Sequence, residues 1–248
     1  GDGATNTDDE DCETPADATE DPQKNWNRSH PRSTPLGPYA GVYDSDGGQI
    51  ITSHLISGGW DDHGVRSATA LHVVTTRTTD GYGYRVRVNE VGLLSGRAAH
   101  SATLTTTVED DLEKRTVLLF GGTLDASGVP VAEILEFTLN TSETSFDVAW
   151  QQTGYTHDRD QTPLPRLTGH GAVVLADGTI LVVGGRDPYG QLTADGWLFD
   201  PVAKEFTHLP DLLSAPRAGH TLTRTETNIV VVGGETTGGQ LAVDALIL

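Results

Sequence analysis

The sequence predicts an all-β fold built from repeated four-stranded sheets, and three observations support this class. An apolar, β-branched run that ends in Gly-Gly occurs four times along the 248 residues. Short strand-like runs alternate with turn signals, with no helical period between them. Glycine is abundant, with 29 residues, as expected where every repeat contributes its own turns and glycine pair.

The Gly-Gly runs mark the second strand of each repeat. They are residues 50–59, 117–122, 180–185 and 229–234, and the first glycines of successive pairs lie 63, 63 and 49 residues apart. An arginine stands upstream of each run, and in three repeats a histidine and a small-residue first strand follow it. These first strands are residues 100–104, 170–175 and 220–223.

Two further strands complete the repeats. Third strands are expected at residues 70–74, 134–138, 196–200 and 242–247, and fourth strands at 84–88, 146–150 and 205–209. Four strands per repeat are typical of a β-propeller blade. The last repeat stops after its third strand, so we expect residues 24–30, around Trp26, to complete that blade by pairing with the strand that ends at Leu248, which leaves no unpaired edge.

The order Pro-Arg, His, Gly-Gly and Leu-x-Phe-Asp resembles the Kelch repeat of the galactose oxidase/Kelch-like proteins. Residues 165–210 match best, with Phe199-Asp200-Pro201 where Kelch units often read Tyr-Asp-Pro. The resemblance spans about residues 25–248 and implies a Kelch-like β-propeller with four visible blades. Such a chain forms either a small ring or part of a larger one, completed by further sequence or by a second copy.

Charge divides the chain into two parts. Residues 1–24 contain nine acidic residues and one base and no large apolar residue, so they are expected to be a flexible acidic leader. The propeller is expected at residues 25–248. The whole chain has 35 acidic and 16 basic residues, a formal charge of −19, which makes nucleic acid an unfavourable partner. No apolar run approaches the ~20 residues of a transmembrane segment.

The leader suggests where the protein works. Its Gly-Asp-Gly start with acidic, Thr and Pro residues resembles the stretch after the lipid-bearing cysteine of bacterial lipoproteins. We therefore expect an extracytoplasmic protein, in the periplasm, on the outer membrane surface or secreted, with a lipid anchor left open. Cys12, the single cysteine, excludes an intrachain disulfide framework and could link the copies of a homo-oligomer.

His100, His170 and His220 occupy corresponding places at the start of a first strand, and Tyr39 stands near that place in the first repeat. Three imidazoles that converge on a channel could hold a transition metal. The alternative is a packing and hydrogen-bonding role, as the Kelch resemblance implies. We favour packing, and expect neither a metal nor a cofactor.

Arg32, Arg97, Arg166 and Arg217 form a second repeated set. At one channel mouth they could bind a carboxylate or another anion. Alternatively, each could tie its blade to the neighbouring blade through a buried carboxylate or carbonyl, which we favour.

Three loops combine an aromatic ring with polar groups, a composition suited to protein or carbohydrate recognition. Their candidate binding residues are Trp60, Asp61 and His63 in the first loop, Tyr155 and His157 in the second, and Tyr189 in the third. Simple polar turns are the alternative interpretation.

The function expected from these features is that of a non-enzymatic protein- or ligand-binding or assembly module of the cell envelope or exterior. No catalytic residue is assigned. Copper radical oxidases similar to galactose oxidase need a cysteine within the propeller, and Cys12 lies in the leader. A carbohydrate-active enzyme such as a sialic acid mutarotase, which is also a Kelch propeller, remains the alternative.

Overall fold

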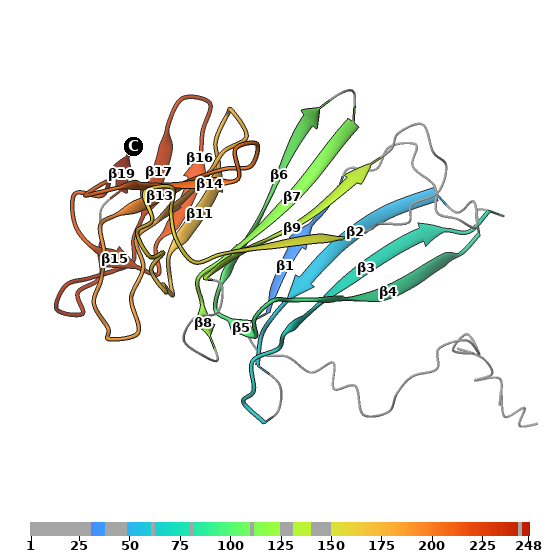
Figure 1. Ribbon diagram of the computed structural model, residues 1–248, viewed down its shortest axis with the longest axis horizontal. Coiled ribbons are helices and arrows are strands. Elements are labelled where there is room, and N and C mark those ends of the chain that lie inside the picture. The colour runs from blue at the N-terminus through green and yellow to red at the C-terminus, as the bar shows by residue number, and fades with distance from the viewer. Residues whose placement is uncertain are drawn as a thin grey trace, which may run out of the picture.

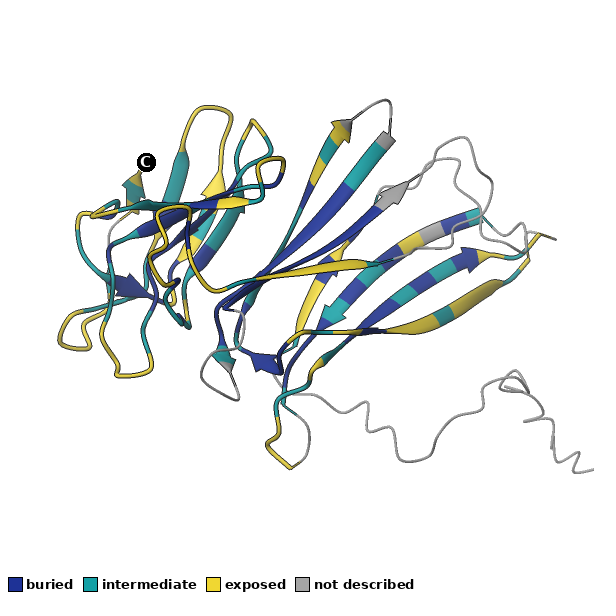
Figure 2. Ribbon diagram, viewed as in Figure 1, coloured by how far each residue is buried: buried dark blue, intermediate teal, exposed yellow. Residues whose placement is uncertain are grey.

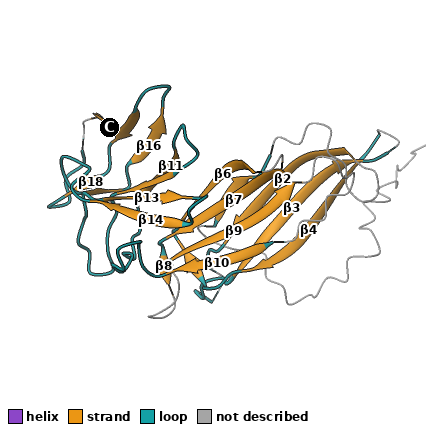
Figure 3. Cartoon of the chain, turned by 45° about the horizontal axis from the view of Figure 1, so that its top comes forward, coloured by secondary structure: helices purple, strands orange, loops and turns teal. Residues whose placement is uncertain are grey.

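The computed structural model of the protein describes residues 31–37, 49–60, 63–79, 82–109, 112–124, 131–139, 150–242 and 245–248. These residues form strands and loops and contain no helix (Figure 3). None of them therefore belongs to a helix that could cross a membrane. The predicted all-β class is confirmed.

Four antiparallel sheets, here called blades, follow one another along the chain. Blade 1 contains β1 (Arg32–Pro35), β2 (Gln49–Ser57), β3 (Thr69–Arg77) and β4 (Tyr84–Gly92). Blade 2 contains β6 (Ser101–Glu109), β7 (Leu112–Phe120), β9 (Ala132–Leu139) and β10 (Gln151–Tyr155). Blade 3 contains β11 (Gly171–Val174), β12 (Ile180–Val183), β13 (Gly196–Asp200) and β14 (Glu205–Leu209). The described strands of blade 4 are β16 (Thr221–Arg224), β17 (Ile229–Val232) and β19 (Ala245–Ile247).

The first strand of each blade is its inner strand. β1 contacts β6, β6 contacts β11, and β11 contacts β16, so the blades stand side by side in chain order. Blades 1 and 4 lie at opposite ends of this array (Figure 1). Within the described residues, β16 and β1 make no extensive contact, and the four blades form an open array.

A short ribbon joins the segment that enters a blade to the segment that follows its Gly-Gly pair. In blade 2, β5 (Arg97–Ala98) pairs with β8 (Thr123–Leu124). In blade 4, β15 (Arg217–Ala218) pairs with β18 (Glu235–Thr236). A single bridge between Thr168 and Arg186 takes this place in blade 3. The ribbons fix the entry of each inner strand.

Apolar side chains fill the spaces between blades, because alternate residues of a strand point to opposite faces of its sheet. Figure 2 shows the buried stretches along the central strands. The core between blades 1 and 2 includes Leu55, Val74, Val117, Leu119, Leu135 and Phe137. The core between blades 2 and 3 includes Leu118, Phe120, Ile134, Val182, Trp197, Phe199 and Phe206. The core between blades 3 and 4 includes Leu181, Val183, Leu213 and Val231.

Blade 3 has the strands that the sequence predicts, with its third strand at Gly196–Asp200 and its fourth at Glu205–Leu209. The prediction of a fourth strand over 146–150 in blade 2 is wrong for Trp150, because β10 begins at Gln151. The expected pairing of residues 24–30 with the last strand lies outside the described residues, as does the acidic leader.

We predict that Phe199→Ala destabilises the protein by about 3–5 kcal/mol, the usual cost of truncating a buried phenylalanine. The Phe199 ring is fully buried, 4.8 Å from the Phe206 ring centroid and 5.8 Å from that of Tyr155. Urea denaturation of the variant measures the change. Tyr189→Ala, at a side chain that is 89% exposed, is the control. A loss below about 1 kcal/mol for Phe199→Ala would contradict the described core.

Candidate functional site

Several loops gather at the edge of the array where the Gly-Gly pairs lie, here called the loop face. The loops after β2, β12 and β17 begin there, and each is closed by a backbone bridge: Trp60 with Arg66, Arg186 with Leu192, and Glu235 with Leu241. The connection from β10 to β11, with the bridge His157–Pro163, reaches the same edge because β11 begins there. The three loops predicted from the sequence therefore share one face.

The predicted loop residues differ in exposure. Trp60 is half-buried, whereas His63, His157 and Tyr189 are exposed. The His157 ring nitrogen Nδ1 lies 2.8 Å from the hydroxyl oxygen of Thr156. Asp61 lies outside the described residues.

Tyr155 belongs to the core between blades 2 and 3 and not to a loop. It ends β10, and its ring lies against those of Phe199 and Phe206 at 5.8 and 5.5 Å between centroids. Burial, together with the nearby Glu136 carboxylate, raises the pKa of the Tyr155 hydroxyl to about 12. The sequence placed Tyr155 in a loop, and the structure corrects this because β10 continues to Tyr155.

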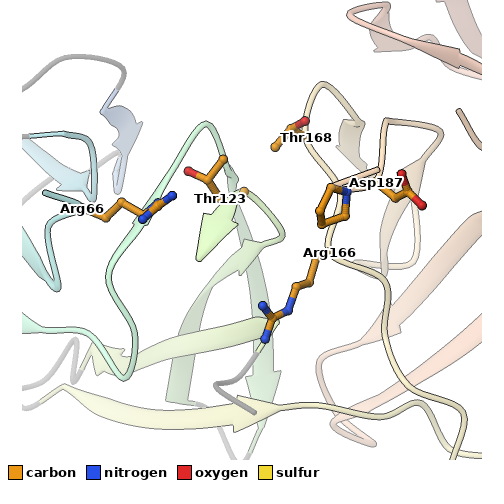
Figure 4. Close-up of a pocket in the computed structure, with 7 residues that line it drawn as sticks. Arg66, Thr123, Arg166, Thr168 and Asp187 are labelled. Carbon is orange, nitrogen blue, oxygen red and sulfur yellow. The ribbon is translucent and has the colours of Figure 1, made fainter. Parts of the chain in front are cut away.

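A pocket of about 360 Å³ lies on the loop face. Its lining comes from three blades: Arg66 from blade 1, Gly122 and Thr123 from blade 2, and Arg166, Thr168, Asp187 and Pro188 from the segments of blade 3. Figure 4 shows Arg66 on one side, Arg166, Thr168 and Asp187 on the other, and Thr123 between them. The pocket therefore depends on the packing of blades 1, 2 and 3.

Hydrogen bonds hold the wall of this pocket. The Asp187 carboxylate accepts from the backbone N–H groups of Tyr189 at 2.9 Å and Gln191 at 2.8 Å, which shapes their loop. The Thr123 hydroxyl donates to the Ala98 carbonyl at 3.3 Å, across the β5–β8 ribbon. The lining contains two guanidinium groups and one carboxylate.

The three repeated histidines lie between blades. His100 is fully buried, and its Nε2 lies 2.8 Å from the Ser57 hydroxyl oxygen at the end of β2. The Nε2 atom of His170 lies 2.8 Å from the Ser101 hydroxyl oxygen in blade 2. His220 is buried beside blade 3, next to Gly184. Each ring thus fills the space between its own blade and the preceding one.

This position explains the repeated Gly-Gly pairs. A Cβ atom on Gly121 would lie 2.4 Å from the Leu167 carbonyl oxygen and 2.9 Å from Cε1 of His170, both in the next blade. The N–H group of Gly122 donates to the same Leu167 carbonyl at 2.7 Å. A Cβ atom on Gly185, in the same blade as His170, would lie 3.0 Å from Cβ of that histidine. Corresponding contacts join Gly58 and Gly59 to Arg97 and His100, and Gly184 and Gly185 to Arg217 and His220.

Burial keeps these histidines uncharged. It lowers the pKa of His100 to about 3 and those of His170 and His220 to about 4. The positive charges of Arg97, at His100, and Arg217, at His220, lower the values further. In the part of the chain that the structure describes, no three His, Cys, Asp or Glu residues are grouped so that they could hold a metal ion.

Arg97 and Arg217 occupy equivalent buried places, each three residues before the histidine of its blade. The Arg97 guanidinium donates to the Val131 carbonyl at 3.2 Å, and its Nη2 lies 3.4 Å from the Glu133 carboxylate. Arg217 donates to the Gly233 carbonyl at 3.2 Å. These partners belong to the arginine's own blade, so through them the two side chains secure the entry of a blade to its own central strands.

Arg166 is not equivalent to Arg97. In blades 2 to 4, one backbone carbonyl accepts a hydrogen bond from the second glycine of the preceding blade. This carbonyl belongs to Arg97 in blade 2 and to Arg217 in blade 4, but to Leu167 in blade 3. Arg166 is one residue earlier, and its side chain reaches the pocket instead. The four arginines that repeat in the sequence therefore do not all occupy equivalent places.

Arg32 occupies a third kind of place. It pairs with Ser57 in the β1–β2 ladder, as Ser101 pairs with Phe120 in blade 2. Its exposed side chain donates from Nε to the His100 carbonyl at 2.7 Å, so it joins blade 1 to blade 2. The same register places Pro31, and not Tyr39, at the position that His100 has in blade 2.

Sequence reasoning missed three of the lining side chains, Arg66, Thr123 and Thr168, whereas Asp187 belongs to the predicted loop that contains Tyr189. Loops of three blades bring them together, so no local motif contains them. One signal was present for Arg166: it stands four positions before His170, whereas Arg97 stands three positions before His100.

We predict that Gly121→Ala costs much more stability than Gly190→Ala. Both glycines have a positive φ, 64° and 85°, which costs alanine about 1–2 kcal/mol. Only Gly121 has the next blade within reach of a new Cβ, while nothing lies within 4 Å at Gly190. This overlap adds about 1–3 kcal/mol or more. Thermal and urea denaturation compare the two variants, and equal losses would refute the close approach of blades.

We predict that the free energy of unfolding falls as the pH drops from about 6.5 towards 4. The unfolded chain binds protons on histidines at the ordinary pKa of 6.5, whereas the folded chain excludes them down to about 4 or below. His100→Gln removes one such group, so the dependence weakens by up to about 1.4 kcal/mol per pH unit. Urea denaturation at stepped pH measures both slopes. An unchanged slope in the variant would show that His100 does not stay neutral.

Residues 167–213 match the Kelch motif in a comparison with known protein families. The match covers blade 3, with His170 and the Gly184-Gly185 pair. A search of curated proteins finds no match. The Kelch motif in blade 3, the repeated four-stranded antiparallel sheets and the side-by-side inner strands support a Kelch-type β-propeller fold.

Proposed function

We propose that this protein is a non-enzymatic binding or assembly module that holds an acidic group of a protein partner on its loop face. The pocket is the observation that carries this proposal, because loops of three blades contribute to it. Loops held on a rigid scaffold are the usual place for recognition in proteins. Kelch repeats also commonly form scaffolds for protein binding, so the architecture supports the same function.

The chemistry of the lining favours a carboxylate. Arg66 and Arg166 bring two guanidinium groups to the pocket, and guanidinium groups bind carboxylates through paired hydrogen bonds. Asp187 is engaged by backbone N–H groups of its own loop, which offsets part of its negative charge. An aspartate or glutamate side chain of a partner, or its C-terminal carboxylate, fits this arrangement.

Two aromatic residues lie next to residues of the pocket lining, one across a backbone bridge and one along the chain. Trp60 pairs through its backbone with the pocket residue Arg66, and Tyr189 lies next to Pro188 in the other loop. Tryptophan, tyrosine and arginine are the residues most often found at binding hot spots. They would surround the bound carboxylate with apolar contact area, as a protein partner requires.

A carbohydrate-active enzyme such as a sialic acid mutarotase is the second candidate. The observation that favours it is the same pair of arginines, because they could hold the carboxylate of an acidic sugar beside the Thr123 and Thr168 side chains. The proton transfers of such an enzyme would need an acid or base in the pocket, and Asp187 is the titratable carboxylate of the lining. We rank this candidate second, since the histidines with lowered pKa lie between blades.

Location outside the cytoplasm, with or without a lipid anchor, is part of the proposal. It is supported by the acidic leader, residues 1–24, and by its resemblance to the spacer of bacterial lipoproteins. The strongly acidic composition also suits a solvated exterior protein. Fractionation of the native host cells, with mass spectrometry of the N-terminus, would decide both points.

We predict that Arg66→Ala/Arg166→Ala weakens binding of a blocked triglutamate peptide at least tenfold, about 1.4 kcal/mol. The reason is the loss of both guanidinium groups from the pocket. Isothermal titration at low salt measures the affinity, with a triglutamine peptide as the uncharged comparison. Arg224→Ala is the matched control, since this exposed arginine ends β16 at the edge opposite the loop face.

The outcomes separate the two candidates. Unchanged peptide affinity in the double variant would overturn the proposed carboxylate site. Accelerated exchange between the anomers of N-acetylneuraminic acid, followed by NMR and abolished by Arg166→Ala, would instead support the enzyme.

A further inference from the structure

The interfaces inside the array follow one rule. Each blade has two faces, here called the following face and the preceding face. Where a neighbour is present, the following face packs on the next blade in the chain and the preceding face packs on the blade before it. In blade 3, for example, Val182 belongs to the core with blade 2, and Val183 belongs to the core with blade 4. An open array of four blades leaves one face of each kind without a neighbouring blade.

The following face of blade 4 is apolar and open. Val232 is 48% exposed and Ile247 is 69% exposed, and Val230 pairs with Ile247 across the sheet. Val232 pairs with the first residue of β16, just as Val183 pairs with the first residue of β11. Val232 is therefore the counterpart of Val183 in blade 3. Val183 is fully buried by blade 4. Blade 4 thus has the apolar residues of an interface that the array does not fill.

The glycine pair of blade 4 is open in the same way. At Gly58, Gly121 and Gly184 a new Cβ would lie within 2.8 Å of the next blade, whereas at Gly233 the nearest atom is the Ala242 carbonyl oxygen at 3.9 Å. The second glycines of blades 1 to 3 donate to a carbonyl of the following blade. Among the described residues, no such acceptor from a further blade meets Gly234.

The preceding face of blade 1 is the open counterpart. Tyr84, Val86 and Val88 lie on it and are 65%, 60% and 45% exposed. Val88 pairs with Val73, which the register makes the counterpart of Leu135 in blade 2. Leu135 is fully buried against blade 1.

The entry of blade 1 is equally unfilled. Pro31 holds the position of His100 and is half-buried, whereas His100 is fully buried between blades 1 and 2. The pyrrolidine ring of Pro31 therefore lies where the Gly-Gly pair of a preceding blade would cover it. Blade 1 thus has an open apolar face and an open entry. These are the two surfaces on which the open face and the glycine pair of blade 4 would pack.

We propose that two copies of this chain associate head to tail, with blade 4 of each copy packed on blade 1 of the other, to form a closed ring of eight blades. A second copy is the occupant because the two open faces continue, in kind and in order, the interfaces already made inside the chain. A head-to-tail contact that is repeated twice closes a two-fold ring. Eight blades lie within the usual size range of propellers.

The first test is the mass in solution. Light scattering and analytical ultracentrifugation of the full chain are expected to give a dimer, twice 26.3 kDa, that dissociates on dilution. A monomer at all concentrations up to about 100-fold above ordinary working levels, or an open series of larger oligomers, would overturn the proposal.

Two surface variants test the head-to-tail order. Val232→Asp/Ile247→Asp charges the face of blade 4, and Val86→Asp/Val88→Asp charges the face of blade 1. Each variant alone is expected to be monomeric, with a dissociation constant raised at least 100-fold and an unchanged circular dichroism spectrum. Val202→Asp, at an exposed valine of the β13–β14 turn, is the control and is expected to remain dimeric.

Mixing provides the decisive result. Each variant retains the face that the other has lost, so an equimolar mixture is expected to form a one-to-one heterodimer through a single intact interface. A dimer that pairs blade 4 with blade 4 would survive in the blade 1 variant alone. That result, or a mixture that stays monomeric while the unmodified chain dimerises, would contradict the head-to-tail ring. These measurements need no carboxylate ligand, so they are independent of the pocket.

Discussion

The close approach of one blade to the next at the Gly-Gly pairs is the constraint on which the rest of the structure depends. At Gly121-Gly122 the chain passes so near blade 3 that the Leu167 carbonyl and the His170 ring leave no space for a side chain. A backbone hydrogen bond fixes that distance, and the apolar side chains of both sheets then meet at a fixed spacing. Because the bond uses a carbonyl, arginine and leucine can both supply it, which is why Arg97 and Leu167 occupy the same place.

This packing determines which polar residues remain for binding. His100 and His170 are committed to serine hydroxyls between blades, and Arg97 is committed to the Val131 carbonyl and Glu133. A histidine buried in such a place stays neutral, because burial lowers its pKa. Arg166 has a different place from Arg97, because its shift by a single residue moves its side chain from the entry of blade 3 to the lining of the pocket.

The sequence was sufficient for the repeat and insufficient for the site. Strands such as Gly196–Asp200 were predicted correctly because a β-branched run, a glycine pair and an aromatic strand are local signals. The fourth strand of blade 2 was misplaced because aromatic content, here Trp150, does not fix a strand boundary. The pocket could not be predicted, since Arg66 and Asp187 are far apart in the chain and meet only through the packing of three blades. Arg32 is not equivalent to the other arginines because of the strand-pairing register in blade 1. The spacing of residues along the sequence does not determine that register.

The location of the pocket allows binding and assembly to coexist. Its lining lies on the loop face of blades 1 to 3, whereas the open apolar surfaces are sheet faces at the two ends of the array. A head-to-tail continuation keeps the direction of every inner strand, because each new blade repeats the relation of β6 to β1. Both loop faces of a two-copy ring would then point to the same side. A partner with two acidic segments could engage both pockets at once, and linked binding of this kind strengthens a weak single contact without any new interaction.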